Sequence, residues 1–299
     1  MRPLNYHHLY YFWRVAREGT ITAACEKLGV AQPTISAQLR TLERSLGKKL
    51  FQQKGRTLEL TDVGRVAYGY ADDIFALGGE LSDILDGRLT GSRTRLRVGV
   101  ADGLPKRVAS RLLAPAVDRQ DLHLICFEGK SAELLVKLSL HELDLVLSDS
   151  PNGSEARIRA YNHQLGECGV VVLGPRGVAS RYRSNFPAAL DAAPFLLPTE
   201  NIPLRRQIDA WFASHGIRPR VAAEFEDSAL LETFVRRSEA LFVAPAVVER
   251  EIIELHAAER VGLVEEVRVR FYAVSLERRV RHSGVALILE AAHRDLFAA

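Results

Sequence analysis

The sequence predicts an α/β protein in two parts, a small helical N-terminal region and a larger region of alternating strands and helices. Two short helices joined by a tight turn, between residues 20 and 46, indicate the first part. Short apolar strand candidates that alternate with helical stretches from Leu96 onward indicate the second part. At 299 residues and 47% hydrophobic, the chain has enough apolar material for two or more domains with their own cores.

The two short helices are delimited by helix-start and helix-stop residues. The first is expected over about Ile21 to Leu28, because Gly29 tolerates the left-handed backbone that ends a helix. The second begins near Pro33, whose missing N–H is not needed in a first turn. At roughly 100° per residue, one narrow stripe of this helix faces the core. It consists of Ile35, Leu39, Leu42 and Leu46.

The opposite face of the second helix carries small and polar side chains. In a helix-turn-helix, the second helix lies in the major groove of DNA and its N-terminal residues meet base edges. A solvated amphipathic helix pair is the alternative explanation. The candidate DNA-binding residues of the helix pair are Thr22, Gln32, Pro33, Thr34, Ser36, Ala37, Gln38 and Arg40.

Positive charge is concentrated in the same region. Residues 1 to 61 carry a net charge of +6, whereas the whole chain carries +3, so residues 62 to 299 carry −3. Such an asymmetry is the electrostatic footprint of phosphate contact. Lys48, Lys49, Lys54 and Arg56 cluster around the segment KGRTLEL, where contacts to the DNA backbone would set register, and Lys54 and Arg56 are added to the candidate DNA-binding residues.

The N-terminal region closely resembles the DNA-binding domain of LysR-type transcriptional regulators. The matched positions are Leu9, Tyr11, Phe12, Glu18, Gly19, Thr22, Ala24, Leu28, Gln32, Ile35, Ser36, Leu39, Leu42, Glu43, Leu46, Gly47, Leu50, Phe51, Gly55, Arg56, Leu60, Thr61 and Gly64. The resemblance implies a winged helix-turn-helix domain over residues 4–61, with the helix-turn-helix at 21–40. It also implies binding to a pseudo-palindromic duplex operator and contact with RNA polymerase. The chain departs from the family pattern at Ala37 and Gln53, where many relatives carry Arg.

A narrower resemblance extends along most of the chain. The segments NYHHLYYFWRVAREG, LHLICFEGKSAELLVKLSLHELDLVLSDSP and GECGV are similar to those of one subgroup, the NhaR-like activators of sodium/proton antiporter genes. This resemblance implies activation of transcription in response to sodium or alkaline stress.

A long linker helix is expected over residues 62–90, after Thr61 as N-cap. Its apolar residues recur at spacings of three and four, and a stripe of this length must be buried against something. The same helix of a second subunit is the expected partner, which gives a homodimer or homotetramer. The alternative is that the helix folds back on its own C-terminal region. The stripe comprises Val63, Val66, Tyr70, Ile74, Leu77, Leu81 and Leu85.

Residues 95–299 are expected to form an effector-binding regulatory domain. The strand candidates are LRVGV, LHLICF, LDLVLSD, GVVVLG, PFLLPT, RVAAEFED, EALFVAP and Val267 to Ser275, and the helices are Pro105 to Asp118, Lys130 to Leu140, Leu204 to His215, Ala229 to Arg236, Ala246 to His256 and one ending at Phe297. This pattern gives two α/β subdomains, about 95–162 with 268–299 and 163–267, joined by two crossover strands. The architecture is that of a periplasmic binding protein, as the LysR resemblance also implies.

A small-molecule or ion effector is expected in the cleft, beyond the C-terminal ends of the strands. Asp102, Asp149, Glu200 and Asp227 are the carboxylates available to a sodium ion. The N–H groups of a helix opened by Gly103 to Pro105 could instead bind an anion. No metal ligand set is certain. The full effector-binding prediction is Asp102, Gly103, Ser131, Asp149, Glu200, Asp227 and Ser228.

Catalysis is not expected, because the sequence has no Gly-rich phosphate loop, HExxH pair or nucleophile elbow. No cofactor is expected. The three cysteines have no paired spacing, and no apolar run approaches the roughly 20 residues that span a bilayer, so a cytoplasmic protein without membrane contact is predicted. The alternative function is a small-molecule-binding protein whose N-terminal helices serve protein contacts rather than DNA.

Overall fold

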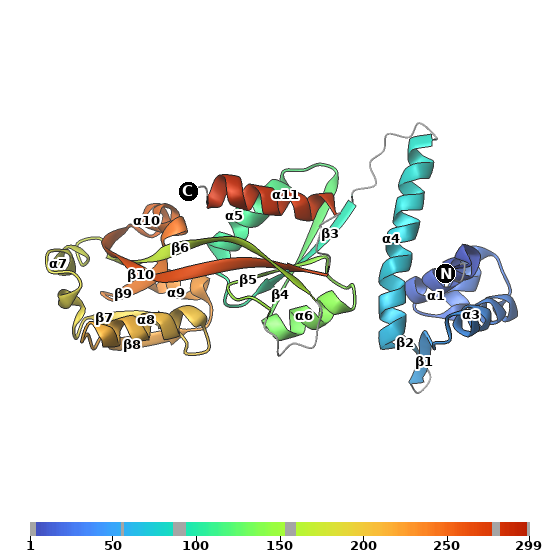
Figure 1. The fold of residues 1–299 in the computed structure, drawn as a ribbon, viewed down its shortest axis with the longest axis horizontal. Coiled ribbons are helices and arrows are strands. Elements are labelled where there is room, and N and C mark those ends of the chain that lie inside the picture. Colours follow the sequence, from blue (N-terminus) through green and yellow to red (C-terminus); the bar gives the residue numbers. More distant parts are fainter. Residues whose placement is uncertain (1–3, 55–56, 86–93, 153–159, 277–281, 298–299) are drawn as a thin grey trace. The chain divides into compact units, whose positions relative to one another are not determined.

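The computed structural model describes residues 4–54, 57–85, 94–152, 160–276 and 282–297 (Figure 1). The chain divides into two compact units, residues 1–93 with 137–143 and residues 94–136 with 144–299, and each is described by itself. Within the described residues, no helix combines the length and the apolar character needed to cross a membrane.

The N-terminal unit is a winged helix-turn-helix followed by a long helix, as predicted. Its elements are α1 (Tyr6–Glu18), α2 (Ile21–Leu28), α3 (Gln32–Leu46), β1 (Phe51–Lys54), β2 (Thr57–Leu60) and α4 (Asp62–Leu85). The two wing strands pair antiparallel, with Phe51 opposite Leu60 and Lys54 opposite Thr57. Gly29 ends α2 with a φ of 65°, which confirms the predicted helix stop.

The core of this unit is built from one face of each short helix. Phe12 of α1, Ala24 of α2, and Ile35 and Leu42 of α3 are fully buried. The prediction that Leu46 belongs to this core stripe is wrong, because its side chain is 42% exposed. Leu46 is the last residue of α3, where Gly47 turns the chain away, so the helix face that buries Leu42 meets no partner one turn later.

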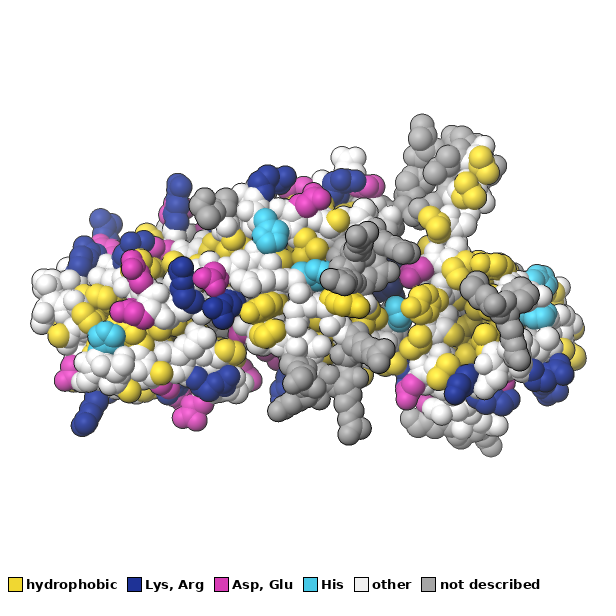
Figure 2. All heavy atoms as spheres, in the orientation of Figure 1, with side chains coloured by type: hydrophobic (Ala, Val, Ile, Leu, Met, Phe, Trp, Pro, Cys, Tyr) yellow, Lys and Arg dark blue, Asp and Glu magenta, His cyan; other side chains and the backbone are white. Residues whose placement is uncertain are grey.

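Helix α4 has a packed face and an exposed face. The Thr61 hydroxyl accepts the Gly64 N–H at 2.9 Å, as predicted for its N-cap. Ile74 and Phe75 pack against the core of the N-terminal unit, so Ile74 belongs partly to this core. Leu77, Leu81 and Leu85 are 68%, 57% and 76% exposed, and Figure 2 shows hydrophobic side chains on the surface at this end of the helix. Residues 86–90 of the predicted helix lie outside the described residues.

The chain from Thr94 on forms a single eight-stranded sheet with helices on it (Figure 1). Its elements are β3 (Thr94–Ala101), α5 (Lys106–Val117), β4 (Leu122–Gly129), α6 (Ser131–Ser139), β5 (Leu145–Ser148), β6 (Tyr161–Pro175), α7 (Ser180–Arg183), η1 (Ala188–Leu190), β7 (Pro194–Pro198), α8 (Pro203–Ser214), β8 (Arg220–Phe225), α9 (Ser228–Val235), β9 (Leu241–Pro245), η2 (Ala246–Val248), α10 (Glu249–His256), β10 (Ala258–Ser275), α11 (Ser283–Ala291) and η3 (Ala292–Leu296).

The strand order β4-β3-β5-β10-β6-β9-β7-β8 divides the sheet into two halves. In the first half β3 pairs parallel with β4 and β5, and in the second half β7 pairs parallel with β8 and β9. The long antiparallel strands β6 and β10 run through both halves, as the crossover prediction requires.

Strands β6 and β10 are longer than the sequence pattern indicates. The predicted segments GVVVLG and Val267 to Ser275 lie inside strands Tyr161–Pro175 and Ala258–Ser275. The added residues of each strand pair mainly with the other strand, across register shifts such as the one between Val264 and Val269. Backbone hydrogen bonds hold these segments in the sheet. Many of their side chains are polar, so a hydrophobicity pattern does not identify the segments as strand.

Candidate functional site

The helix-turn-helix exposes the predicted DNA-contacting face. The Thr20 hydroxyl accepts the Ala23 N–H at 3.1 Å and starts α2, and Pro33 lies in the first turn of α3. Because the core stripe of α3 is buried, the other face of its N-terminal half is solvent-accessible. On the helix pair, Ser36 and Gln38 are half-buried, and the exposed candidates are Thr22, Gln32, Pro33, Thr34, Ala37 and Arg40.

The wing candidates are described only in part. The backbone of Lys54 ends β1, whereas Arg56 lies outside the described residues. Lys48 is exposed, and the ammonium of Lys49 contacts the Glu43 carboxylate at 2.6 Å. Part of the positive charge predicted around the wing is therefore paired within the protein.

Glu43 joins α3 to the first wing strand, a role that the sequence reasoning did not predict. Its Oε1 accepts the backbone N–H groups of Leu50 at 3.0 Å and Phe51 at 3.4 Å. Burial raises the pKa of Glu43, but the hydrogen bonds from Lys49, Leu50 and Phe51 outweigh it, so the pKa is lowered overall. The ionised carboxylate therefore holds the wing at a fixed distance from the recognition helix.

Trp13 links α1 to the long helix α4. Its indole N–H donates to Asp72 Oδ1 at 2.8 Å, and its ring packs against Phe75 at a centroid distance of 5.2 Å. The guanidinium groups of Arg14 and Arg17 lie 5.6 and 5.2 Å from the Trp13 ring. Trp13 is buried, so its ring serves packing within the N-terminal unit.

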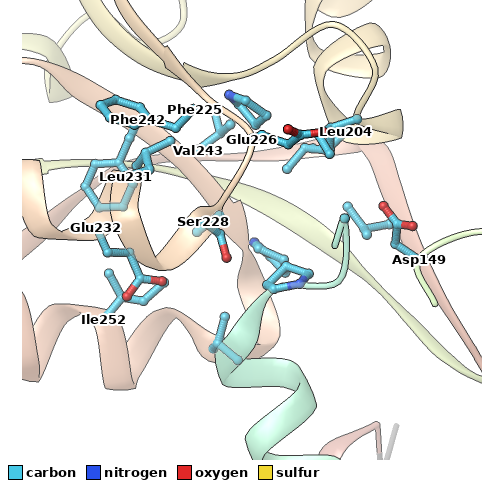
Figure 3. Close-up of a pocket in the computed structure, with 18 of the residues that line it drawn as sticks. Asp149, Leu204, Phe225, Glu226, Ser228, Leu231, Glu232, Phe242, Val243 and Ile252 are labelled. Atoms are coloured by element: carbon cyan, nitrogen blue, oxygen red, sulfur yellow. The ribbon is translucent and has the colours of Figure 1, made fainter. Parts of the chain in front are cut away.

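A cavity of about 700 Å³, its mouth included, lies between the two halves of the large sheet (Figure 3). Four of the predicted effector residues line it, namely Asp102, Gly103, Asp149 and Ser228. The first three follow the C-terminal ends of β3 and β5, and Ser228 begins α9. The expectation that a ligand binds beyond the C-terminal ends of the strands therefore selected four residues that line one cavity.

The other three predicted effector residues do not line this cavity. The Ser131 hydroxyl lies 3.4 Å from that of Ser148. The Glu200 backbone carbonyl accepts a hydrogen bond from Arg206. Asp227 caps α9 by accepting the Leu230 N–H at 2.7 Å, which directs its carboxylate to the helix end.

The sequence did not predict two of the carboxylates that line the cavity, those of Glu226 and Glu232. Glu226 accepts a hydrogen bond from the Asn201 amide at 2.8 Å. Glu232 lies four residues after Ser228 on α9, so the helical repeat places both on one face, and that spacing was the available signal.

The pKa of Asp149, which lines the cavity, is raised. Burial raises the pKa of Asp149, against smaller lowering effects from its own N–H, the Ser150 hydroxyl and the charge of Arg206. A Cβ atom at Gly103 would lie 2.8 Å from Asp149 Oδ2, so the carboxylate lies directly over the Gly103 backbone. A larger residue at position 103 would displace it.

Two family models together match most of the chain. The model described as bacterial regulatory helix-turn-helix protein, lysR family, matches residues 6–65, and the LysR substrate binding domain matches residues 90–296. The "Transcriptional activator protein NhaR" of Escherichia coli (strain K12) is 37% identical over 298 residues, covering 99% of this chain and 98% of the relative. A RuBisCO operon transcriptional regulator of Allochromatium vinosum is 27% identical over 259 residues, covering 86% and 83%.

Solved structures support the same fold. ArgP from Mycobacterium tuberculosis has a TM-score of 0.65 at 18% identity and covers 97% of both chains. CbnR complexed with its target DNA has a TM-score of 0.53 at 20% identity and covers 97% of this chain and 99% of that chain. With both domain models matched in order and one relative alike over nearly its full length, the chain belongs to the LysR family of bacterial helix-turn-helix regulators.

Proposed function

We propose that this chain is a transcriptional activator that binds a pseudo-palindromic duplex operator in the cytoplasm as a homodimer or homotetramer and contacts RNA polymerase. The exposed face of the N-terminal half of α3, opposite the buried Ile35 and Leu39, is the observation that carries the DNA-binding role. The name of the E. coli relative supports activation rather than repression.

The DNA contacts divide into two kinds. The side chains of Ser36 and Arg40, on the open face of α3, read base edges, whereas Lys48, Lys54 and Arg56 around the wing contact phosphates. The first kind sets sequence preference, and the second sets register and salt dependence.

The cavity of the C-terminal unit holds the effector. If the effector changes DNA affinity, DNA must change effector affinity by the same factor, since the coupling free energy is reciprocal. Sodium or alkaline stress, the signal implied by the subgroup resemblance, remains a prediction about the inducing condition and does not identify the molecule in the cavity.

Genome-wide mapping of bound sites with and without added sodium tests operator and signal together. We expect enrichment of a two-fold-related motif upstream of genes whose transcription the protein raises. Measured in parallel, the affinity of the purified full chain for such a site should fall steeply with salt. Weak binding to DNA that is insensitive to salt and to DNA sequence would exclude sequence-specific DNA recognition. It would favour a small-molecule-binding protein whose N-terminal helices make protein contacts.

A further inference from the structure

The cavity wall combines a large apolar area with four carboxylates. Apolar side chains come mainly from the second half of the sheet and its helices, and they include Leu204, Phe225, Leu231, Phe242, Val248 and Ile252. Among the lining residues of the described chain, the charged groups are Asp102, Asp149, Glu226 and Glu232, and none is a lysine or arginine. A ligand that fits this wall needs an apolar body and positive charge.

Two of the four carboxylates already have strong partners. Glu232 accepts from Arg107 Nε at 2.7 Å, and Glu226 accepts from the Asn201 amide at 2.8 Å. The remaining two, Asp102 and Asp149, are therefore the groups left to face a ligand.

Asp102 and Asp149 are brought together by strand register. β3 and β5 are neighbouring parallel strands in which Val100 lies opposite Leu147, and Asp102 and Asp149 are the first residues after these two strands. Gly103 permits close approach, since its missing side chain leaves room for the Asp149 carboxylate. In Figure 3 the Asp149 side chain lies across the open cavity from Ser228 and Glu232.

The same geometry disfavours an anion. The Asp149 carboxylate lies over Gly103, just before the N-terminus of α5, where an anionic ligand would otherwise meet free N–H groups. Arg206 acts on Asp149 only through its charge, because its guanidinium donates to the Glu200 and Asn201 carbonyls at 3.2 and 3.3 Å. Among the residues that the structure describes, no lysine or arginine forms an ion pair with Asp149, so a cation that enters the cavity would compensate this desolvated carboxylate.

We propose that the effector of this regulator is an organic cation, an ammonium group on an apolar body, with the ammonium between Asp102 and Asp149 and the body against Phe225, Leu231 and Phe242. This inference rests on the proposed function as an effector-responsive regulator and names the chemical class of the effector. It explains the apolar and the acidic lining of the cavity together, whereas a bare metal ion would leave the apolar part of the cavity unfilled.

The full-length chain and a matched set of six-carbon probes test the proposal by calorimetric titration and thermal shift. Hexylammonium should bind and raise the melting temperature, whereas hexanoate, 1-hexanol and sodium chloride at equal concentration should not. Each CH₂ added or removed along a butyl-to-octyl ammonium series should change the affinity about four-fold.

Two variants locate the ammonium. Asp149→Asn and Asp102→Asn should each weaken hexylammonium binding at least about ten-fold, while Asp118→Asn, on an exposed helix end, should bind like the wild type. Circular dichroism of each variant checks that the fold is retained. Where Asp149→Asn does not fold, Asp102→Asn carries the test alone.

Three results would overturn the proposal. They are tighter binding of hexanoate than of hexylammonium, binding of sodium alone, and no binding by any ammonium of the series. Affinity for operator DNA is measured on the same preparations, so a chain that binds DNA but no ammonium defeats this inference and leaves the proposed function standing.

Discussion

Arg107 of α5 donates from Nε to the Glu232 carboxylate of α9 at 2.7 Å, and thereby joins the two halves of the C-terminal unit beside the cavity. Nε2 of His256, the last residue of α10, lies 3.1 Å from both the Arg107 guanidinium and the Glu232 carboxylate. Arg111, one turn further along α5, donates to the Val247 carbonyl at 2.9 Å. Because Glu232 also lines the cavity, the contacts that hold the halves together share a residue with the proposed effector site.

Removing the Arg107 guanidinium should destabilise this unit. Arg107→Ala leaves the mostly buried Glu232 carboxylate without its strongest partner, at a cost of about 2 kcal/mol, since hydrogen bonds to charged groups are worth more than neutral ones. Calorimetric melting of the full chain measures the loss. Arg119→Ala is the control, because its pair with Asp121 lies on the surface, and it should melt like the wild type. Identical melting of both variants would show that the bridge is unimportant.

Substitutions on the open face of α3 should change sequence preference. Ser36→Ala or Arg40→Ala should cost about 1 to 3 kcal/mol at the specific site and relax the preference there, because a base-edge contact is lost. Arg56→Ala should weaken binding to all sequences alike and flatten the salt slope. Titrations on specific and random duplexes separate the two effects. Equal losses on both duplexes for Arg40→Ala would mean that this side chain does not face the groove.

The exposed end of α4 should mediate self-association. Leu81→Glu places a charge in the apolar stripe with Leu77 and Leu85 and should lower the oligomeric state, as measured by sedimentation velocity. Ser82→Glu, at an exposed neighbouring position, adds the same charge outside the stripe and should leave the mass unchanged. An unchanged mass in both variants would place the dimer contact elsewhere.

Acid should remove the contribution of Glu43 to stability. The pKa of Glu43 is lower in the folded chain than that of an unperturbed glutamate, so its stabilisation is fully present above the unfolded pKa and disappears as pH falls through the folded pKa. Glu43→Gln should therefore melt below the wild type at neutral pH, and the difference should shrink below about pH 4. Thermal melts across this range measure the difference, and a constant gap would show that the carboxylate charge does not hold the wing.

Two aspartates near the cleft should differ in the response to effector. Asp102→Asn removes a cavity carboxylate and should abolish the effect of the inducing signal on transcription, without loss of basal operator affinity. Asp227→Asn should keep the response, because Asn caps a helix about as well as Asp and this residue caps α9. A reporter gene under the operator, read with and without the signal, compares them. Loss of the response in Asp227→Asn but not in Asp102→Asn would show that the response depends on Asp227 and not on Asp102.

The sequence predicted the elements that short-range rules govern. The Gly29 stop, the Thr61 cap and the buried Ile35 and Leu42 follow from local backbone preference and helical periodicity, and all are found in the structure. Four effector candidates at one cavity followed from the rule that parallel strands end at a common edge.

The sequence by itself determined the family, the order of the domains and several strand ends that line the cavity, because these depend on local patterns and matched positions. The tertiary structure decided which carboxylates share the cavity. Glu232 lines the cavity because α9 directs its side chain inward, whereas the Asp227 carboxylate caps the N-terminus of α9. It also decided that β6 and β10 extend past their apolar segments and that Leu46 is exposed. The cavity position of Glu232 and the length of β6 and β10 depend on partners distant in sequence, whose positions no local pattern contains.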